Sequence, residues 1–200
     1  MTQPQVYIID DDDAVRDSMS LLFESADIPH SCFESADQFV SGFDGTQRGC
    51  LVLDMRMPGL TGLELQAQLN AREARLPIVF ITGHGDVPMA VEAMRRGAVD
   101  FLRKPVNEGD FLERIQQALQ LEADGWNEQR NLDQIKRRVA TLTARECEVF
   151  ALVGEGSSNK LIASNLGISE RTVEVHRSQV MKKLEVTTLA QLVRIHLQWN

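Results

Sequence analysis

The chain lacks the features that mark membrane and exported proteins. No apolar run reaches the roughly 18 residues of a transmembrane segment, and the first residues form no basic, apolar leader. We therefore expect a cytoplasmic protein without a membrane partner.

Cysteine is scarce, with three residues at wide spacing, Cys32, Cys50 and Cys147. An odd number this far apart forms no disulfide framework, and we expect reduced, mostly buried thiols. The four histidines show no metal-ligand spacing with each other or with the cysteines: His30, His84, His176 and His196. A zinc site is therefore not expected.

What is present is an ordinary globular composition with an uneven charge. The 200 residues are 43% hydrophobic and 25% charged, enough for one large domain or two modest ones. Residues 1–122 hold 10 Lys+Arg and 20 Asp+Glu, a net −10, whereas residues 123–200 hold 11 and 9, a net +2. This asymmetry is compatible with nucleic-acid binding by the C-terminal part, but not by the acidic N-terminal part.

Short apolar runs alternate with helical patterns five times in the first ~120 residues. The expected strands are Val6–Ile9, a weaker His30–Phe33, Cys50–Asp54, Ile78–Ile81 and Val99–Leu102. Asp13, Ser35 and Asp110 are expected to cap three helices, and two more helices are expected to begin near Gly62 and at Val87. The helix from Val87 should end at Arg96, before Gly97. Right-handed crossovers then predict a parallel sheet with helices on both sides.

Polar residues follow four of these strands: Asp10 and Asp11, Asp54, Thr82 and Lys104. The carboxyl ends of parallel strands share one rim, so we expect these side chains to converge. Carboxylates packed together resist ionising unless a hard cation lies among them, and oxygen ligands alone favour Mg²⁺. Lys104 and the Thr82 hydroxyl would help to hold a phosphoryl group, and Asp54, on the central strand, is the natural nucleophile.

Taken singly, each of these residues has an ordinary structural explanation. Asp12 and Asp13 suit helix capping and solvated charge. Lys104-Pro105 alone is typical of a turn, in which a cis bond would fix the direction of the lysine. Their joint occurrence at the correct strand ends is what favours a phosphate site.

Together these motifs resemble the receiver domain of two-component response regulators, over roughly residues 4–121. The resemblance implies a flavodoxin-like, doubly wound, five-stranded sheet and phosphorylation of Asp54 by a sensor histidine kinase. It makes Asp11 and Asp54 Mg²⁺ ligands, with Asp10 in support and the Arg56 carbonyl oxygen as a third ligand. Thr82 would swing toward the phosphate and Phe101 would rotate inward, although a core aromatic at Phe101 fits equally well.

Residues 122–141 predict a helical linker, either continuous or interrupted at Gly125. Leu132, Ile135, Val139 and Leu142 form an apolar stripe that would pack on either domain or on a second copy, and packing within the chain is favoured.

The last part of the chain predicts four helices. A capping box at Thr143–Glu146 starts one, Ser158 caps Asn159–Leu166, Ser169 caps a third to about Leu184, and Thr188–Leu197 forms a fourth. Two short helices joined by a glycine turn indicate a helix-turn-helix. In the first helix of this pair we expect the core-facing side chains to be Leu161, Ile162 and Leu166. In the second helix we expect them to be Val173, Val180, Met181 and Leu184.

Four segments here resemble the LuxR-type DNA-binding domain: Leu142–Glu146, Glu155–Ala163, Leu166–Ser169 and Thr172–Arg177. Paired with the receiver, they make the chain similar to the FixJ/NarL group of response regulators. The expected DNA contacts are Asn159, Lys160, Arg171, Thr172, Glu174, Val175, Arg177, Ser178 and Lys182. Glu174 is a departure, because an acid repels phosphate and suits a cytosine amino group instead. His176 would touch DNA or pack partly buried.

The combined reading is a transcription factor with a receiver at 1–121 and an output domain at 142–200. Phosphorylation would promote dimerisation around Val87–Leu119 and binding to promoter DNA, with RNA polymerase as a further candidate partner. The only chemistry expected is phosphoryl transfer to Asp54 and hydrolysis from it. A phosphohydrolase is disfavoured because Arg56 stands where its second acid would be, and a protein-binding output domain is the other alternative.

Overall fold

The computed structural model describes residues 3–83 and 87–199. It divides into two compact units, residues 1–126 and residues 127–200, which are considered separately below. His84 lies outside the described residues. Among those described, no helix combines the length and the apolar character that crossing a membrane requires.

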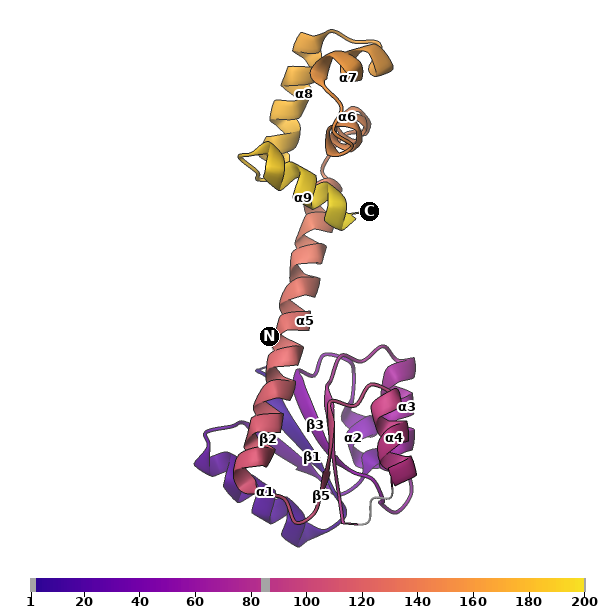
Figure 1. Cartoon of the computed structure of the whole chain (residues 1–200), viewed down its shortest axis with the longest axis vertical. Coiled ribbons are helices and arrows are strands. Elements are labelled where there is room, and N and C mark those ends of the chain that lie inside the picture. Colours follow the sequence, from indigo (N-terminus) through magenta and orange to yellow (C-terminus); the bar gives the residue numbers. More distant parts are fainter. Residues whose placement is uncertain (1–2, 84–86, 200) are drawn as a thin grey trace. The chain divides into compact units, whose positions relative to one another are not determined.

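The first unit is built on a five-stranded parallel sheet in the order β2-β1-β3-β4-β5 (Figure 1). Its strands are β1 Gln5–Ile9, β2 His30–Phe33, β3 Gly49–Asp54, β4 Ile78–Thr82 and β5 Asp100–Arg103. The strand order places β1 and β3 side by side at the point where the winding reverses. The predicted doubly wound fold is confirmed, and this reversal is where such sheets bind ligands.

Helices cover both faces of the sheet: α1 and α5 lie on one side and α2, α3 and α4 on the other (Figure 1). Their bounds are α1 Asp13–Ser25, α2 Ala36–Gly42, α3 Gly62–Ala71, α4 Val87–Arg95 and α5 Glu108–Val139. Strand residues alternate between two cores. Ile8 and Val52 pack with Phe23 of α1, whereas Ile9 and Leu53 pack on the opposite face. Burial on both faces explains why these strands are continuously apolar in sequence.

Several helix and strand starts differ from prediction by a few residues. Asp12, not Asp13, caps α1, because its side chain accepts from the backbone N–H of Ala14. Asp110 lies inside α5, and the Asn107 side chain accepts from the first N–H groups instead. β5 begins at Asp100, one residue later than expected. At both helix starts a nearby residue offers the same capping chemistry as the predicted one.

Helix α5 runs without a break through Gly125, so of the two alternatives for the linker the continuous helix is the one found. Within the first unit, its buried Glu122 accepts two hydrogen bonds from Arg48, at 2.9 and 3.0 Å. The same guanidinium lies over the ring of Trp126, 4.4 Å from its centre. This contact attaches the middle of α5 to the segment that leads into β3.

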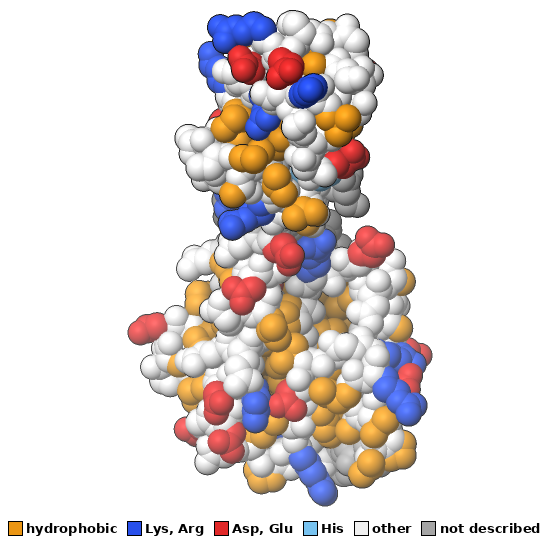
Figure 2. Space-filling model, turned by 45° about the horizontal axis from the view of Figure 1, so that its top comes forward, with side chains coloured by type: hydrophobic (Ala, Val, Ile, Leu, Met, Phe, Trp, Pro, Cys, Tyr) orange, Lys and Arg blue, Asp and Glu red, His pale blue; other side chains and the backbone are white. Residues whose placement is uncertain are grey.

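The second unit contains four further helices, α6 Ala144–Gly154, α7 Asn159–Leu166, α8 Glu170–Lys183 and α9 Leu189–Trp199. Ile135 and Val139 of α5, with Leu142, pack in its core, so the apolar stripe packs within the chain as favoured. All three predicted caps are present: the Thr143–Glu146 capping box on α6, Ser158 on α7 and Ser169 on α8. Lys/Arg and Asp/Glu side chains lie side by side on the surface of this unit, at the top of Figure 2.

One inward assignment is wrong, and so is the expectation of mostly buried thiols. Leu161 is 50% exposed, because Ile162 and Ala163 fill the core position of α7. Leu166 and Met181 are half-buried and pack against the core, and Val173, Val180 and Leu184 are buried, all as predicted. Cys50 is buried, but Cys147 is half-buried and Cys32 is exposed; all three are free thiols.

Candidate metal centre and nucleic-acid interface

The strand register brings the predicted acids to one level of the sheet. Ile9 pairs with Leu53, so Asp10 leaves β1 beside the point where Asp54 ends β3. Asp54 pairs in turn with Ile81, the residue before Thr82. Lys104 follows β5, and its N–H donates to the Thr82 carbonyl at 2.8 Å. Residues far apart in sequence therefore meet at the carboxyl rim of β1, β3, β4 and β5.

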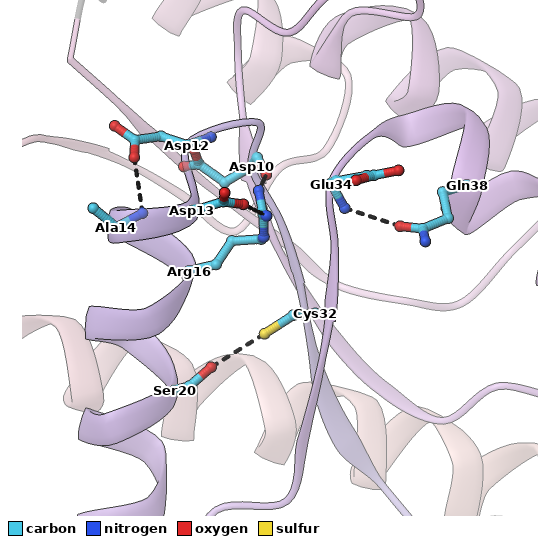
Figure 3. Close-up of polar contacts among 9 residues, drawn as sticks. All are labelled: Asp10, Asp12, Asp13, Ala14, Arg16, Ser20, Cys32, Glu34 and Gln38. Carbon is cyan, nitrogen blue, oxygen red and sulfur yellow. Dashed lines mark hydrogen bonds and ion pairs between the residues drawn. The ribbon is translucent and has the colours of Figure 1, made fainter.

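Asp10 is held by contacts on both its backbone and its side chain (Figure 3). One carboxylate oxygen accepts from the Asp12 N–H at 3.0 Å, and the other accepts from Lys104 Nζ at 2.6 Å. Arg16 donates to the Asp10 carbonyl at 2.6 Å and also pairs with Asp13. The lysine, expected beside a phosphoryl group, thus has a carboxylate partner at the same rim.

Three carboxylates converge here, since one oxygen each from Asp10, Asp11 and Asp54 lies within 4.8 Å of the others. Asp10 and Asp54 are buried and Asp11 is exposed. One oxygen of Asp54, Oδ1, is buried without a hydrogen-bond partner among the described residues. The pKa of Asp54 is raised to about 6, chiefly by burial; Lys104 lowers it, and the charges of Asp10 and Asp11 contribute to the rise.

This donor set suits a hard divalent cation. The three residues offer only carboxylate oxygens, the ligands that Mg²⁺ prefers, and a buried orphan oxygen points to a missing positive partner. Across the described residues this is the one cluster of three His, Cys, Asp or Glu side chains near enough together for a metal ion.

A glycine permits the close packing beneath Asp54. Gly62 opens α3, and a Cβ there would lie 2.3 Å from the Asp54 carbonyl oxygen. Any side chain would therefore push the helix away from the end of β3. The Gly62 N–H donates to the Met55 carbonyl at 3.2 Å, which ties α3 to the loop after Asp54.

The other predicted receiver residues lie around this rim. Thr82 is buried at the end of β4, and Phe101 is half-buried beside its pairing partner Phe80. Arg56 has an exposed side chain in the loop after β3. The Lys104–Pro105 peptide bond is cis. Arg16 was missed from the sequence; its only signal was its position on the first turns of α1, after the acid run.

In the second unit, α7 and α8 form the helix-turn-helix. Beyond Glu170 in the first turn, the exposed residues of α8 recur at helical spacing: Arg171, Glu174, Val175, Ser178, Gln179 and Lys182. Thr172, expected on this face, is half-buried, and its hydroxyl lies 2.8 Å from that of Ser169 at the cap. His176 is half-buried, in line with the packing alternative.

Two shallow hollows flank this face of α8, and Glu174 and Ser178 line both of them. Arg171 Nη1 lies 3.0 Å from Glu174 Oε2. Arg177 donates to the Asn159 side chain and so connects α8 with the first turn of α7, next to exposed Lys160. The face combines flanking cations with hydrogen-bonding and small apolar groups, a mixture that suits a major groove.

Comparisons with known proteins agree with both halves of this geometry. The family described as "Response regulator receiver domain" matches residues 6–116, and "Bacterial regulatory proteins, luxR family" matches residues 140–196. The chain is 44% identical to the transcriptional regulatory protein FixJ of Azorhizobium caulinodans, over 96% of this chain and 91% of FixJ. It is 42% identical to the response regulator protein TodT of Pseudomonas putida, over 95% of this chain and 84% of TodT.

Two solved structures resemble the whole chain. The response regulator StyR matches with a TM-score of 0.89 and 46% identity, covering 98% of this chain and all of StyR (100%). Full-length FixJ from B. japonicum matches with a TM-score of 0.61 and 42% identity, covering 100% of this chain and 98% of that structure.

Proposed function

The chain belongs to the two-component response regulators with a LuxR-type DNA-binding domain, and we propose that phosphorylation of Asp54 controls its binding to promoter DNA. The observation that carries the proposal is the convergence of Asp10, Asp11 and Asp54 within 4.8 Å, beside Lys104. We assign residues 1–121 to the receiver, 122–141 to the linker and 142–200 to the DNA-binding domain.

In this proposal Asp54 is the phosphoacceptor. One of its oxygens attacks the phosphorus of a phosphohistidine on the sensor kinase, and a P–O bond forms while the P–N bond breaks. Mg²⁺ held by Asp11, Asp54 and the Arg56 carbonyl, with Asp10 in support, would neutralise the negative charge on the transferring group. Asp54 is suited to attack because one of its oxygens is already without a hydrogen-bond partner in the described structure.

Lys104 and Thr82 act on the phosphoryl group after transfer. Lys104 exchanges its contact with Asp10 for one with a phosphoryl oxygen, and Thr82 turns its hydroxyl toward the same group. Phe101, which pairs with Phe80 two residues before Thr82, then moves inward. Phe carries no hydroxyl, so this movement changes packing without making a hydrogen bond of its own.

The movement is transmitted to the face formed by α4, β5 and the first turns of α5. Val87, Val91 and Met94 of α4 are 76%, 43% and 45% exposed, an apolar surface that a second copy would cover. Phosphorylation shifts the population toward the dimer, and two output domains then bind a two-part site.

Asp54→Asn tests the assignment. With acetyl phosphate and MgCl₂, the parent chain takes up phosphate and gains affinity for a promoter duplex in a gel shift, whereas the variant does neither. Phosphate on Asp54→Asn would refute the phosphoacceptor. Equal shifts with and without acetyl phosphate would refute control of DNA binding.

Lys182→Ala tests the DNA-facing surface. Lys182 is exposed on α8, so its loss removes a phosphate contact, weakens binding to all sequences and lowers the slope of log K against log salt by about 1. Arg72→Ala removes an exposed cation from the first unit and is the matched control. A slope that is the same in both variants would exclude Lys182 from the interface.

A further inference from the structure

We infer that Glu174 reads a cytosine in the DNA site and that Arg171 holds its carboxylate ready for that contact. The inference rests on the proposed DNA-binding function and concerns which base the α8 surface selects. It begins from the position of Glu174, which lines both hollows on this face and lies one turn from each of Arg171 and Ser178.

The acid cannot serve as a phosphate contact. Cations and hydrogen-bond donors position a protein on the DNA backbone, and a carboxylate there would repel the phosphates. Glu174 is exposed, so it is not retained for packing in the core. Its remaining role on a groove-facing surface is to accept a hydrogen bond from a base edge.

The hydrogen-bonding groups on the base edges determine which base a carboxylate can contact. In the major groove cytosine presents its amino group as a lone donor, whereas adenine presents an amino donor beside the N7 acceptor. Guanine offers two acceptors and thymine one, and neither can donate to a carboxylate. A carboxylate, which only accepts, therefore favours cytosine.

Arg171 explains how an acid is tolerated on a surface that approaches DNA. Its Nη1 lies 3.0 Å from Glu174 Oε2, and the two side chains are 86% and 50% exposed. The pair reduces the repulsion that Glu174 would exert on approaching phosphates. Because exposed pairs of this kind are weak, Arg171 can transfer its contact to the backbone while the Glu174 carboxylate turns to the base.

Glu170 provides a matched control. It is an exposed acid one turn earlier on α8, and its place in the first turn is accounted for by the helix dipole. It lines neither hollow. If losing a negative charge from α8 is enough to alter DNA binding, Glu170→Gln should show the same alteration as a Glu174 variant. If Glu174 contacts a base, Glu170→Gln should keep the base preference of the parent.

The experiment is a selection from a randomised duplex library by the full-length chain with acetyl phosphate and MgCl₂. The parent and Glu170→Gln should enrich the same sites, with a cytosine at one position of each half-site. Glu174→Ala should lose that preference, and Glu174→Gln should move it to adenine, whose donor and acceptor match a glutamine amide. On one selected duplex, changing that C·G pair to T·A should weaken the parent roughly tenfold and Glu174→Ala less than about twofold.

Unchanged base frequencies in Glu174→Ala and Glu174→Gln would overturn the inference and leave DNA binding intact. The same shift in Glu170→Gln would also overturn it, since the effect would then be one of charge. If the parent enriches no duplex, DNA binding itself fails, and the inference fails with it.

Discussion

Two buried carboxylate sites lie at opposite ends of β3, and they differ in how far their negative charge is neutralised by cationic side chains. At the amino end, Glu122 accepts both of its hydrogen bonds from Arg48, and its side chain is only 5% exposed. At the carboxyl end, Asp54 shares its surroundings with Asp10 and Asp11, and Lys104 is the cation bonded to this group.

The difference separates a structural site from a functional one. One acid and one guanidinium in a planar, two-bond contact satisfy each other and need nothing from outside. Three acids around one ammonium leave excess negative charge in a partly buried place, and the Asp54 pKa is raised to about 6, chiefly by burial and also by the charges of Asp10 and Asp11. Such a site costs stability until a cation binds, and that cost is typical of a functional site.

Breaking the balanced site should have the largest effect. Arg48→Ala leaves the Glu122 carboxylate buried without a cation and removes the guanidinium that covers Trp126. We expect the free energy of unfolding of the first unit to fall by about 3–5 kcal/mol, as for other buried pairs that lose one member. Urea-dependent alkylation of Cys50, followed by mass spectrometry, measures this unit separately from the second.

Arg48→Lys is the matched control for that variant. It keeps the charge but cannot make the two parallel hydrogen bonds, so its loss of stability should be intermediate. If the free energy of unfolding of Arg48→Ala lies within about 0.5 kcal/mol of the parent's, the Arg48–Glu122 pair contributes no more than an ordinary surface ion pair. The two ends of β3 would then not differ in the way described.

Removing the negative charge of Asp54 from the acidic site should raise stability instead of lowering it. With EDTA present at pH 7.5, Asp54→Asn should raise the free energy of unfolding by about 1–2 kcal/mol, less than the full pKa shift would give because water reaches the rim. Asp17→Asn, which alters an exposed acid on α1, should change it by less than about 0.5 kcal/mol. Urea titrations of the three proteins, again read at Cys50, make the comparison.

The same cause predicts a pH dependence. The folded pKa of Asp54, about 6, exceeds the ordinary value of 3.8, so the folded state binds the proton more tightly. Its contribution to stability is therefore greatest below pH 4 and is lost as the pH rises through about 6. The stability difference between Asp54→Asn and the parent should grow over this interval. A constant difference from pH 4 to pH 7 would show that burial does not penalise the Asp54 charge.

The carboxyl end of β3 could be predicted from the sequence because its signals are local. Each apolar run ends at a polar residue, and parallel strands bring such ends together whatever lies between them. Even the weak strand His30–Phe33 forms with the predicted bounds. The exchange of Asp12 for Asp13 as the cap shows the limit of this approach, since four successive acids offer the same capping chemistry.

The amino end could not be predicted in this way. Arg48 and Glu122 are 74 positions apart, and neither belongs to a pattern that distinguishes it from a solvated charge. The same limit hides the contact between Lys104 and Asp10, 94 positions apart. In α7, eight residues make too few turns to set the phase of the helix, so Leu161 was placed inward although Ile162 occupies that position.

The smallest expected effect concerns a thiol at the balanced end. Burial, aided by the Glu122 charge, raises the Cys50 pKa to about 12, whereas Cys32 is exposed on β2. In the native parent at pH 8, N-ethylmaleimide should therefore label Cys50 at least ~100-fold more slowly than Cys32, with no change in stability. Peptide mass spectrometry over a time course measures both rates in one sample. Because thiolate is needed for attack, equal rates would mean that water reaches the Glu122 end of β3 as freely as it reaches Asp11 at the other end.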